Sequence, residues 1–161
     1  EFPGDVLCFS LQKNGRVTGN TVVGGVISLF MNKESRCNSN IVEDSNTAGI
    51  FISVPAENNL VEANTVRRST GSGVVVRRQI DHRDGPDGVS GSVLTPPTYR
   101  APGIVIRDNL VEDSRFMGIE IDQTVDAVIE GNVVRTPDFH GIYFLRTDGP
   151  QVIGNRAEDF G

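Results

Sequence analysis

The chain has 161 residues, which is enough for one domain with a hydrophobic core. It carries 15 Lys and Arg against 21 Asp and Glu, a formal net charge of −6, so the phosphate backbone of a nucleic acid is an unfavourable partner. No apolar run reaches the roughly 18 residues that a membrane-spanning helix needs, so we expect no membrane partner either.

The ends of the sequence indicate a piece of a longer or processed chain. There is no initiator Met and no signal peptide, and Glu1-Phe2 resembles a cloning scar. The repeats described below begin almost at once and continue to Gly161. We therefore expect residues 1–161 to form a single domain, with another domain or chain continuing the same architecture.

Short β-branched runs follow one another along the chain, from VLCFS at 6–10 onward, separated by Gly, Asn, Asp and Ser. Long helical patterns are missing, which predicts an all-β protein. Six windows share one pattern with Asn at the fifth place: RVTGNTV (16–22), RCNSNIV (36–42), LVEANTV (60–66), VIRDNLV (105–111), VIEGNVV (128–134) and QVIGNRA (151–157).

Small or β-branched residues flank each Asn in two aligned columns. Three residues before it stand Val17, Cys37, Val61, Ile106, Ile129 and Val152, and two after it stand Val22, Val42, Val66, Val111, Val134 and Ala157. A second phrase, a Gly followed by an alternating strand, occurs as GIFIS at 49, GVVVR at 73, GIEID at 118 and GIYFL at 141. One repeat thus holds three short strands in about 23 residues, too few for a crossover helix.

These repeats predict a solenoid in which each repeat makes one coil and equivalent strands stack in parallel, about 4.8 Å apart. The aligned windows and Gly-strand phrases resemble the right-handed parallel β-helix family of pectate-lyase-like proteins. The resemblance implies a right-handed parallel β-helix of about six coils over nearly the whole chain. We expect each Asn to sit at a tight bend, to adopt left-handed backbone geometry and to bond to neighbouring coils.

The column three residues after each Asn reads Val23, Glu43, Arg67, Glu112, Arg135 and Glu158. Its signs alternate from Glu43 onward, which predicts an external ladder of ion pairs rather than a site. Cys37 lies in a core column and is expected to be a buried free thiol. A Cys8–Cys37 disulfide between adjacent coils is the alternative; without it both cysteines are expected to be inert small hydrophobic residues.

The interval from Asn64 to Asn109 is 45 residues, about 22 more than one repeat. Residues 79–101 hold the excess. They are expected to form a loop insertion, because Pro86, Pro96 and Pro97 suit turns better than inner strands, although a degenerate coil would also satisfy the length. A long polar insertion in a compact repeat points to function.

The strand after each Gly is expected to point alternate side chains outward, and in β-helix enzymes the corresponding face and its loops form the polysaccharide groove. Hydrolysis of a glycoside uses two carboxyl groups. The candidate catalytic residues on this face and in the insertion are Glu120, Asp122, Asp81, Asp84 and His82, and the candidate substrate-binding residues are Arg77, Arg78, Tyr143, His140 and Phe51. A structural alternative is that Asp122 pairs with Arg77 of the neighbouring coil.

Two functions follow from this resemblance and from these residues. The first is a secreted or periplasmic polysaccharide-active enzyme, a glycoside hydrolase or a lyase, without a cofactor; a lyase could use Ca²⁺. The second is a non-catalytic glycan-binding or structural module, in which Phe51, Tyr143 and Tyr99 stack on sugar rings. No metal site is predicted, and the expected ligand is a polysaccharide or oligosaccharide.

Overall fold

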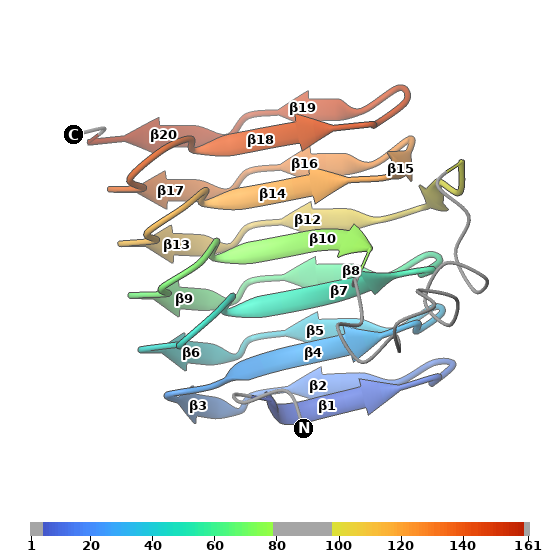
Figure 1. Cartoon of the computed structure of the whole chain (residues 1–161), viewed down its shortest axis with the longest axis horizontal. Helices are drawn as coiled ribbons and strands as arrows, with labels where there is room; N and C mark the ends of the chain where they lie inside the picture. The colour runs from blue at the N-terminus through green and yellow to red at the C-terminus, as the bar shows by residue number, and fades with distance from the viewer. Residues whose placement is uncertain (1–4, 79–97, 160–161) are drawn as a thin grey trace, which may run out of the picture.

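The computed structural model describes residues 5–78 and 98–159, and this part of the chain consists of short strands joined by turns. The strands stack as successive coils from β1 near the N-terminus to β20 near the C-terminus (Figure 1). The all-β solenoid with about six coils, expected from the repeats, is confirmed.

Three parallel six-stranded sheets run the length of the stack, and each takes one strand from every coil. The first sheet contains β1 (Asp5–Ser10), β4 (Val26–Phe30), β7 (Ile50–Val54), β10 (Val74–Arg78), β14 (Ile119–Asp122) and β18 (Ile142–Leu145). The last four of these strands follow the Gly of the four Gly-strand phrases. This sheet faces the viewer in Figure 1.

The other two sheets contain the strands on either side of the Asn column. The second sheet has β2 (Arg16–Thr18), β5 (Arg36–Asn38), β8 (Leu60–Glu62), β12 (Val105–Arg107), β16 (Val128–Glu130) and β19 (Gln151–Ile153). The third has β3 (Thr21–Val23), β6 (Ile41–Glu43), β9 (Thr65–Arg67), β13 (Leu110–Glu112), β17 (Val133–Arg135) and β20 (Arg156–Glu158). Two further short strands, β11 (Ala101–Pro102) and β15 (Thr124–Val125), form a separate two-stranded parallel sheet.

The six Asn side chains form a continuous hydrogen-bonded ladder between the second and third sheets. At each step the backbone N–H and the side-chain Nδ2 of one Asn donate to the Oδ1 of the Asn one coil further on, over 2.8–3.0 Å. The four inner members are buried. The ladder therefore satisfies the polar groups of a bend that lies inside the protein.

The left-handed backbone lies one residue earlier than the sequence suggested. The residues with positive φ at this bend are Gly19, Ser39, Ala63, Asp108, Gly131 and Gly154. The expectation that Asn itself supplies this geometry was wrong. Asn is needed at the next position because its amide both donates and accepts, which lets one residue type link every coil to the next.

Asn64 and Asn109 belong to neighbouring coils, although 45 residues separate them. The backbone N–H of Asn64 donates to Asn109 Oδ1 at 2.9 Å, and β8 and β9 pair directly with β12 and β13. No complete coil therefore stands between them in the described part of the chain.

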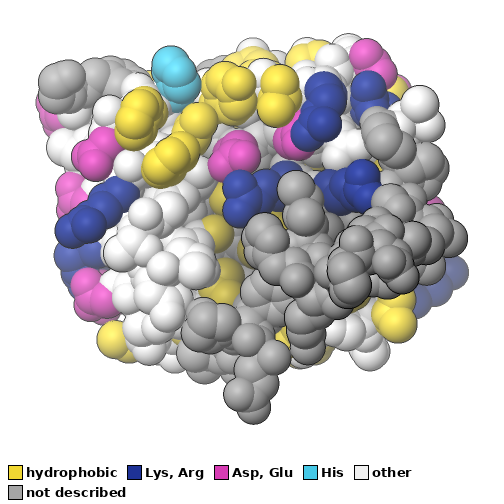
Figure 2. Space-filling view, in the orientation of Figure 1, with side chains coloured by type: hydrophobic (Ala, Val, Ile, Leu, Met, Phe, Trp, Pro, Cys, Tyr) yellow, Lys and Arg dark blue, Asp and Glu magenta, His cyan; other side chains and the backbone are white. Residues whose placement is uncertain are grey.

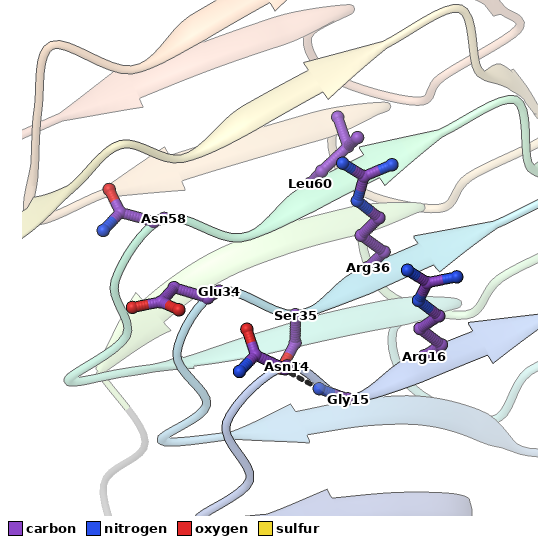
Figure 3. Close-up of a pocket in the computed structure, with 8 residues that line it drawn as sticks. All are labelled: Asn14, Gly15, Arg16, Glu34, Ser35, Arg36, Asn58 and Leu60. Carbon is purple, nitrogen blue, oxygen red and sulfur yellow. Dashed lines mark hydrogen bonds between the residues drawn. The ribbon is translucent and has the colours of Figure 1, made fainter.

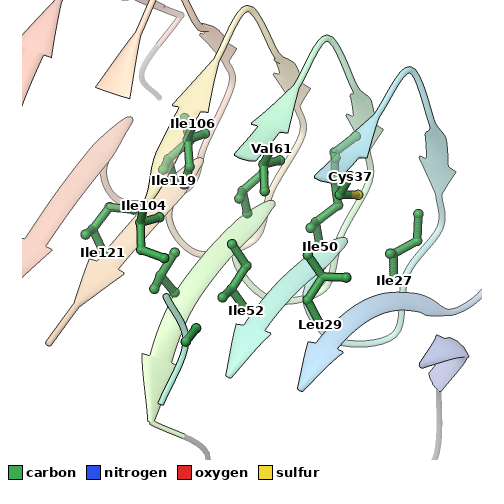
Figure 4. Close-up of a cluster of buried hydrophobic side chains, with 14 of the residues drawn as sticks. Ile27, Leu29, Cys37, Ile50, Ile52, Val61, Ile104, Ile106, Ile119 and Ile121 are labelled. Atoms are coloured by element: carbon green, nitrogen blue, oxygen red, sulfur yellow. The ribbon is translucent and has the colours of Figure 1, made fainter. Parts of the chain in front are cut away.

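The core is a set of apolar stacks that run along the solenoid (Figure 4). Ile50, Ile52, Ile119 and Ile121 of the first sheet are fully buried, as their alternation predicts. Cys37 is buried between Val17 and Val61 in the second sheet and is a free thiol, as expected. Cys8 is also free, so the disulfide alternative was wrong, and because Cys8 is exposed it is not an inert core residue.

Candidate functional site

The outer face of the first sheet presents two rows of side chains that run across the coils. Register pairing aligns the first row as Ser28, Phe51, Val75, Glu120 and Tyr143. The second row contains Phe30, Ser53, Arg77, Asp122 and Leu145. Figure 2 views this face and shows cationic and acidic side chains lying side by side over its upper part.

Glu120 lies near the middle of the first row on β14. Its Oε2 accepts a hydrogen bond from Ser72 Oγ at 2.8 Å, and its Oε1 lies 3.7 Å from Arg77 Nη1. The side chain is 16% exposed, so the carboxylate is partly desolvated yet reachable. Because only one short hydrogen bond holds it, Glu120 is the less constrained of the two outward carboxylates on this strand.

Asp122 lies two residues further along the same face of β14 and is buried. Both of its carboxylate oxygens contact the guanidinium of Arg146, with Arg146 Nε donating to Oδ1 at 2.8 Å and Nη2 donating to Oδ2. The pairing raises the pKa of Arg146 through this hydrogen bond and the Asp122 charge. The alternative that Asp122 pairs with Arg77 was wrong. Arg77 pairs with Glu120, and the partner of Asp122 is Arg146, which directly follows β18.

Arg77 connects the acidic centre of the face to its apolar part. Its guanidinium carbon lies 5.9 Å from the centroid of the Phe51 ring, a cation–π distance. Phe51 in turn packs on a small outer cluster of Val26, Ala48 and Val75. Val75 and Ser53 are buried although they point outward, because neighbouring side chains cover them. Strand alternation in the sequence could not show this cover.

Tyr143 and His140 form a flat aromatic pair at the end of the first row. Their ring centroids are 5.5 Å apart and the rings are 9° from parallel. His140 is exposed and Tyr143 is half-buried. The structure thus places Tyr143 beside its register partner Glu120, and His140 against Tyr143.

Arg78, another predicted binding residue, does not belong to the two rows. It pairs in register with the buried Val54, so strand alternation directs it to the opposite side from Arg77. Tyr99 is also not an open sugar platform. It packs against the core, its hydroxyl donates to the Ala56 carbonyl at 3.3 Å, and burial, together with the nearby Glu57 charge, raises its pKa.

The sequence analysis missed three contributors to this face: Ser72, Arg146 and the pair Phe116 and Phe139. The two Phe rings are 5.1 Å apart, and their side chains are 49% and 59% exposed. Each Phe stands two residues before the Gly of its phrase, in FMGIE and FHGIY. That shared position could have predicted the contact between the two rings, because equivalent positions in adjacent coils lie side by side.

The predicted catalytic residues Asp81, His82 and Asp84 lie outside the described residues, as does most of the insertion assigned to 79–101. Within residues 5–78 and 98–159, no group of three or more His, Cys, Asp or Glu side chains is placed to hold a metal ion. None of the described segments forms a helix that is long and apolar enough to cross a membrane.

The face combines three chemical capabilities. Glu120 can exchange a proton with a bound molecule, Asp122 is held in place by Arg146, and the aromatic rings can pack on the apolar side of a sugar. Two residues along a strand separate the Glu120 and Asp122 backbones by about 7 Å.

No protein-family model matches the sequence, and no curated protein matches it significantly. Among solved structures, the chain is similar to a double mutant of the periplasmic alginate epimerase AlgG, with a TM-score of 0.67 and 19% identity over 89% of this chain and 30% of that one. It therefore spans less than a third of that protein. Endopolygalacturonase I from Stereum purpureum gives a TM-score of 0.43 and 11% identity, covering 92% of this chain and 55% of the other. The first likeness shows that this chain has the right-handed parallel β-helix fold.

Proposed function

We propose that this protein is polysaccharide-active and binds a glycan across β10, β14 and β18 on the outer face of the first sheet. The observation that carries the proposal is the pair Glu120 and Asp122, which project from one face of β14 between Arg77 and the Tyr143–His140 rings. The structural likeness to an alginate epimerase supports a polysaccharide as the ligand. The same likeness supports a periplasmic or extracellular location.

The reaction that fits these groups best is hydrolysis of a glycosidic bond. Glu120, in its protonated form, donates its proton to the leaving-group oxygen, and Asp122 accepts a proton from the attacking water. Arg146 orients Asp122 by binding both of its oxygens. Tyr143 and His140 support one sugar ring, and Arg77 can bind a hydroxyl or carboxylate group on the next.

A second candidate function is glycan binding without catalysis. The observation that favours it is the same contact between Arg146 and both oxygens of Asp122, because the guanidinium occupies the carboxylate that would otherwise bind the attacking water. In this function the exposed rings of Phe116, Phe139 and His140 bind the glycan, and the charged residues set the orientation.

The experiment is a polysaccharide panel assayed for new reducing ends and for unsaturated sugar products, with binding measured in parallel. We expect Glu120→Gln to lower hydrolysis by at least about 100-fold while retaining binding, because it removes the proton donor and little else. Glu130→Gln is the matched control, since Glu130 is an exposed acid on the second sheet. It should leave the rate unchanged.

Asp122→Asn separates the two candidates further. Loss of turnover with retained binding supports hydrolysis, and binding without any product from the native chain supports the second candidate. Full turnover in both Glu120→Gln and Asp122→Asn contradicts the site, and unsaturated products contradict hydrolysis.

A further inference from the structure

A polar pocket lies away from the first-sheet face, at the bend that leads into the second sheet. It has a volume of about 440 Å³ and is lined by Asn14, Gly15, Arg16, Glu34, Ser35, Arg36, Asn58 and Leu60. Volumes of roughly 300–1,000 Å³ are typical of small-ligand sites. Figure 3 shows Arg16 and Arg36 extending side by side in one direction, with Leu60 next to Arg36.

The two arginines are direct register partners on β2 and β5, one coil apart. Stacked strands are about 4.8 Å apart, so two guanidinium groups in adjacent coils repel each other. Within residues 5–78 and 98–159, the guanidinium groups of Arg16 and Arg36 have no hydrogen-bond or ion-pair partner, and the backbone N–H of Arg36 donates to the Gly15 carbonyl. This pair therefore differs from the third-sheet column of Glu43, Arg67, Glu112, Arg135 and Glu158, in which opposite charges alternate.

Most other described arginines have an acidic partner. Those with an ion pair are Arg67, Arg68, Arg77, Arg100, Arg107, Arg135, Arg146 and Arg156. The pocket's own carboxylate, Glu34, lies 3.4 Å from Lys13 and so does not neutralise the arginines. The uncompensated charge of the pocket is thus the two guanidinium groups.

We propose that this pocket binds an oxyanion, a carboxylate, sulfate or phosphate group, between Arg16 and Arg36. Each guanidinium offers a planar fork of N–H donors that matches two oxygens, so a bound oxyanion replaces a repulsion with charge-assisted hydrogen bonds. The side-chain amides of Asn14 and Asn58 are additional donors at the rim. Leu60 gives the pocket an apolar wall, which suits a small organic body that carries the anionic group.

The site is independent of the proposed polysaccharide face, because it uses the second sheet and the first three coils. Its test is binding and not turnover. The probes are sodium sulfate alone, galacturonate, and neutral galactose, each titrated into the intact chain by calorimetry, with the side-chain N–H signals of Arg16 and Arg36 followed by NMR. Sulfate tests whether the pocket binds a free inorganic oxyanion, and galacturonate tests whether it binds a carboxylate carried on a sugar. Galactose controls for sugar binding without charge.

We expect saturable one-site binding of sulfate or galacturonate, weaker at high NaCl, with shifts of both Arg side-chain signals. Arg16→Gln and Arg36→Gln should each lower the affinity by at least about tenfold, since each removes a charge-assisted bidentate contact. Arg115→Gln is the matched control, because Arg115 is exposed and lies after β13, far from the pocket in sequence and coil. It should change the affinity by less than about twofold.

Three results overturn the proposal: no saturable binding of either anion, equal affinity in the Arg16→Gln and Arg36→Gln variants, or an equal loss in Arg115→Gln. Galactose binding as tight as galacturonate binding also overturns it, because the anionic group would then contribute nothing. Circular dichroism of each variant checks that the exposed substitutions leave the fold intact.

Discussion

Asn109 shows how much of this fold depends on single side chains. Its Oδ1 accepts from the backbone and the side chain of Asn64, and its Nδ2 donates to Asn132 Oδ1 and to the Val61 carbonyl. The side chain of Asn20, at the first coil, only donates within this ladder, and Asn20 is half-buried. The same residue type therefore makes different contributions along one ladder.

We expect Asn109→Ala to lower the free energy of unfolding by about 3 kcal/mol, because it leaves several buried polar groups without partners. Asn20→Ala should cost about 1 kcal/mol, since it removes one side-chain donor at the end of the ladder and leaves the backbone donor in place. Urea denaturation followed by circular dichroism measures both. Equal costs for the two variants would show that the ladder does not act through burial.

The thiol of Cys37 gives the protein a pH-dependent stability. Burial raises its pKa to about 12, against a smaller opposing effect of the hydrogen bond from Asn40. The folded state therefore holds this proton more tightly than the unfolded state, and the stabilisation is complete below pH 9 and lost as the pH rises towards 12. The loss is on the order of 4 kcal/mol for a shift of this size.

Cys37→Val should remove this part of the alkaline destabilisation, because valine has no group that titrates. The substitution should fit, because the register neighbours of Cys37 in the same column, Val17 and Val61, are themselves valines. Comparing urea denaturation of the variant and the native chain at pH 8 and at pH 11 isolates the effect from other titrating groups. A native chain that loses no more stability than the variant over this range would refute the assignment.

At the scale of the strand, ion pairs between neighbouring coils and glycines that allow close packing set the register. On the third sheet Glu112 lies between Arg67 at 2.8 Å and Arg135 at 3.0 Å, as the alternating column predicted. Burial opposes ionisation of Glu112, but the hydrogen bonds and charges of both arginines outweigh it and lower its pKa.

Gly73, just before β10, has no room for a side chain: an added Cβ would lie 2.2 Å from Val111 Cγ1 and 2.8 Å from the Gly118 carbonyl.

Gly73→Ala is expected to cost about 3 kcal/mol, because one contact is with backbone that cannot move without disturbing the next coil. Gly19→Ala is the comparison. Gly19 has a φ of +69° but open space around its added Cβ, so only the left-handed backbone is strained, at about 1 kcal/mol. Thermal and urea unfolding of both variants give the two costs. A Gly73→Ala variant as stable as Gly19→Ala would mean that the coils can shift apart.

At the scale of the molecule, stability is distributed unevenly along the stack. Each coil packs only on its neighbours, so an inner coil is covered on both sides and the last described coil on one. Ile119 is fully buried, whereas its register partner Ile142 is only half-buried. The strands of the last coil, β18 to β20, pair with one neighbour each within the described part of the chain. A further domain or chain that continues the solenoid stays a prediction.

Ile119→Ala should lower the free energy of unfolding by about 3 kcal/mol and Ile142→Ala by about 1 kcal/mol, because only the first leaves a closed cavity. Amide hydrogen exchange should follow the same order, slowest in β7, β10 and β14 and fastest in β18 to β20. Equal costs, with uniform exchange along the stack, would show that the solenoid unfolds as one unit and not from its end.

The sequence by itself determined the coil, its length and its core, because a solenoid repeats one local arrangement and the apolar, Asn and charge columns recur with it. It also placed Glu120, Tyr143 and Phe51 on one face through strand alternation. The tertiary structure alone decided which coils are neighbours across the 45-residue interval, because contacts between coils do not depend on separation along the chain. It alone assigned Arg146 to Asp122, and left Arg16 beside Arg36, because long side chains reach across coils into positions that no single repeat specifies.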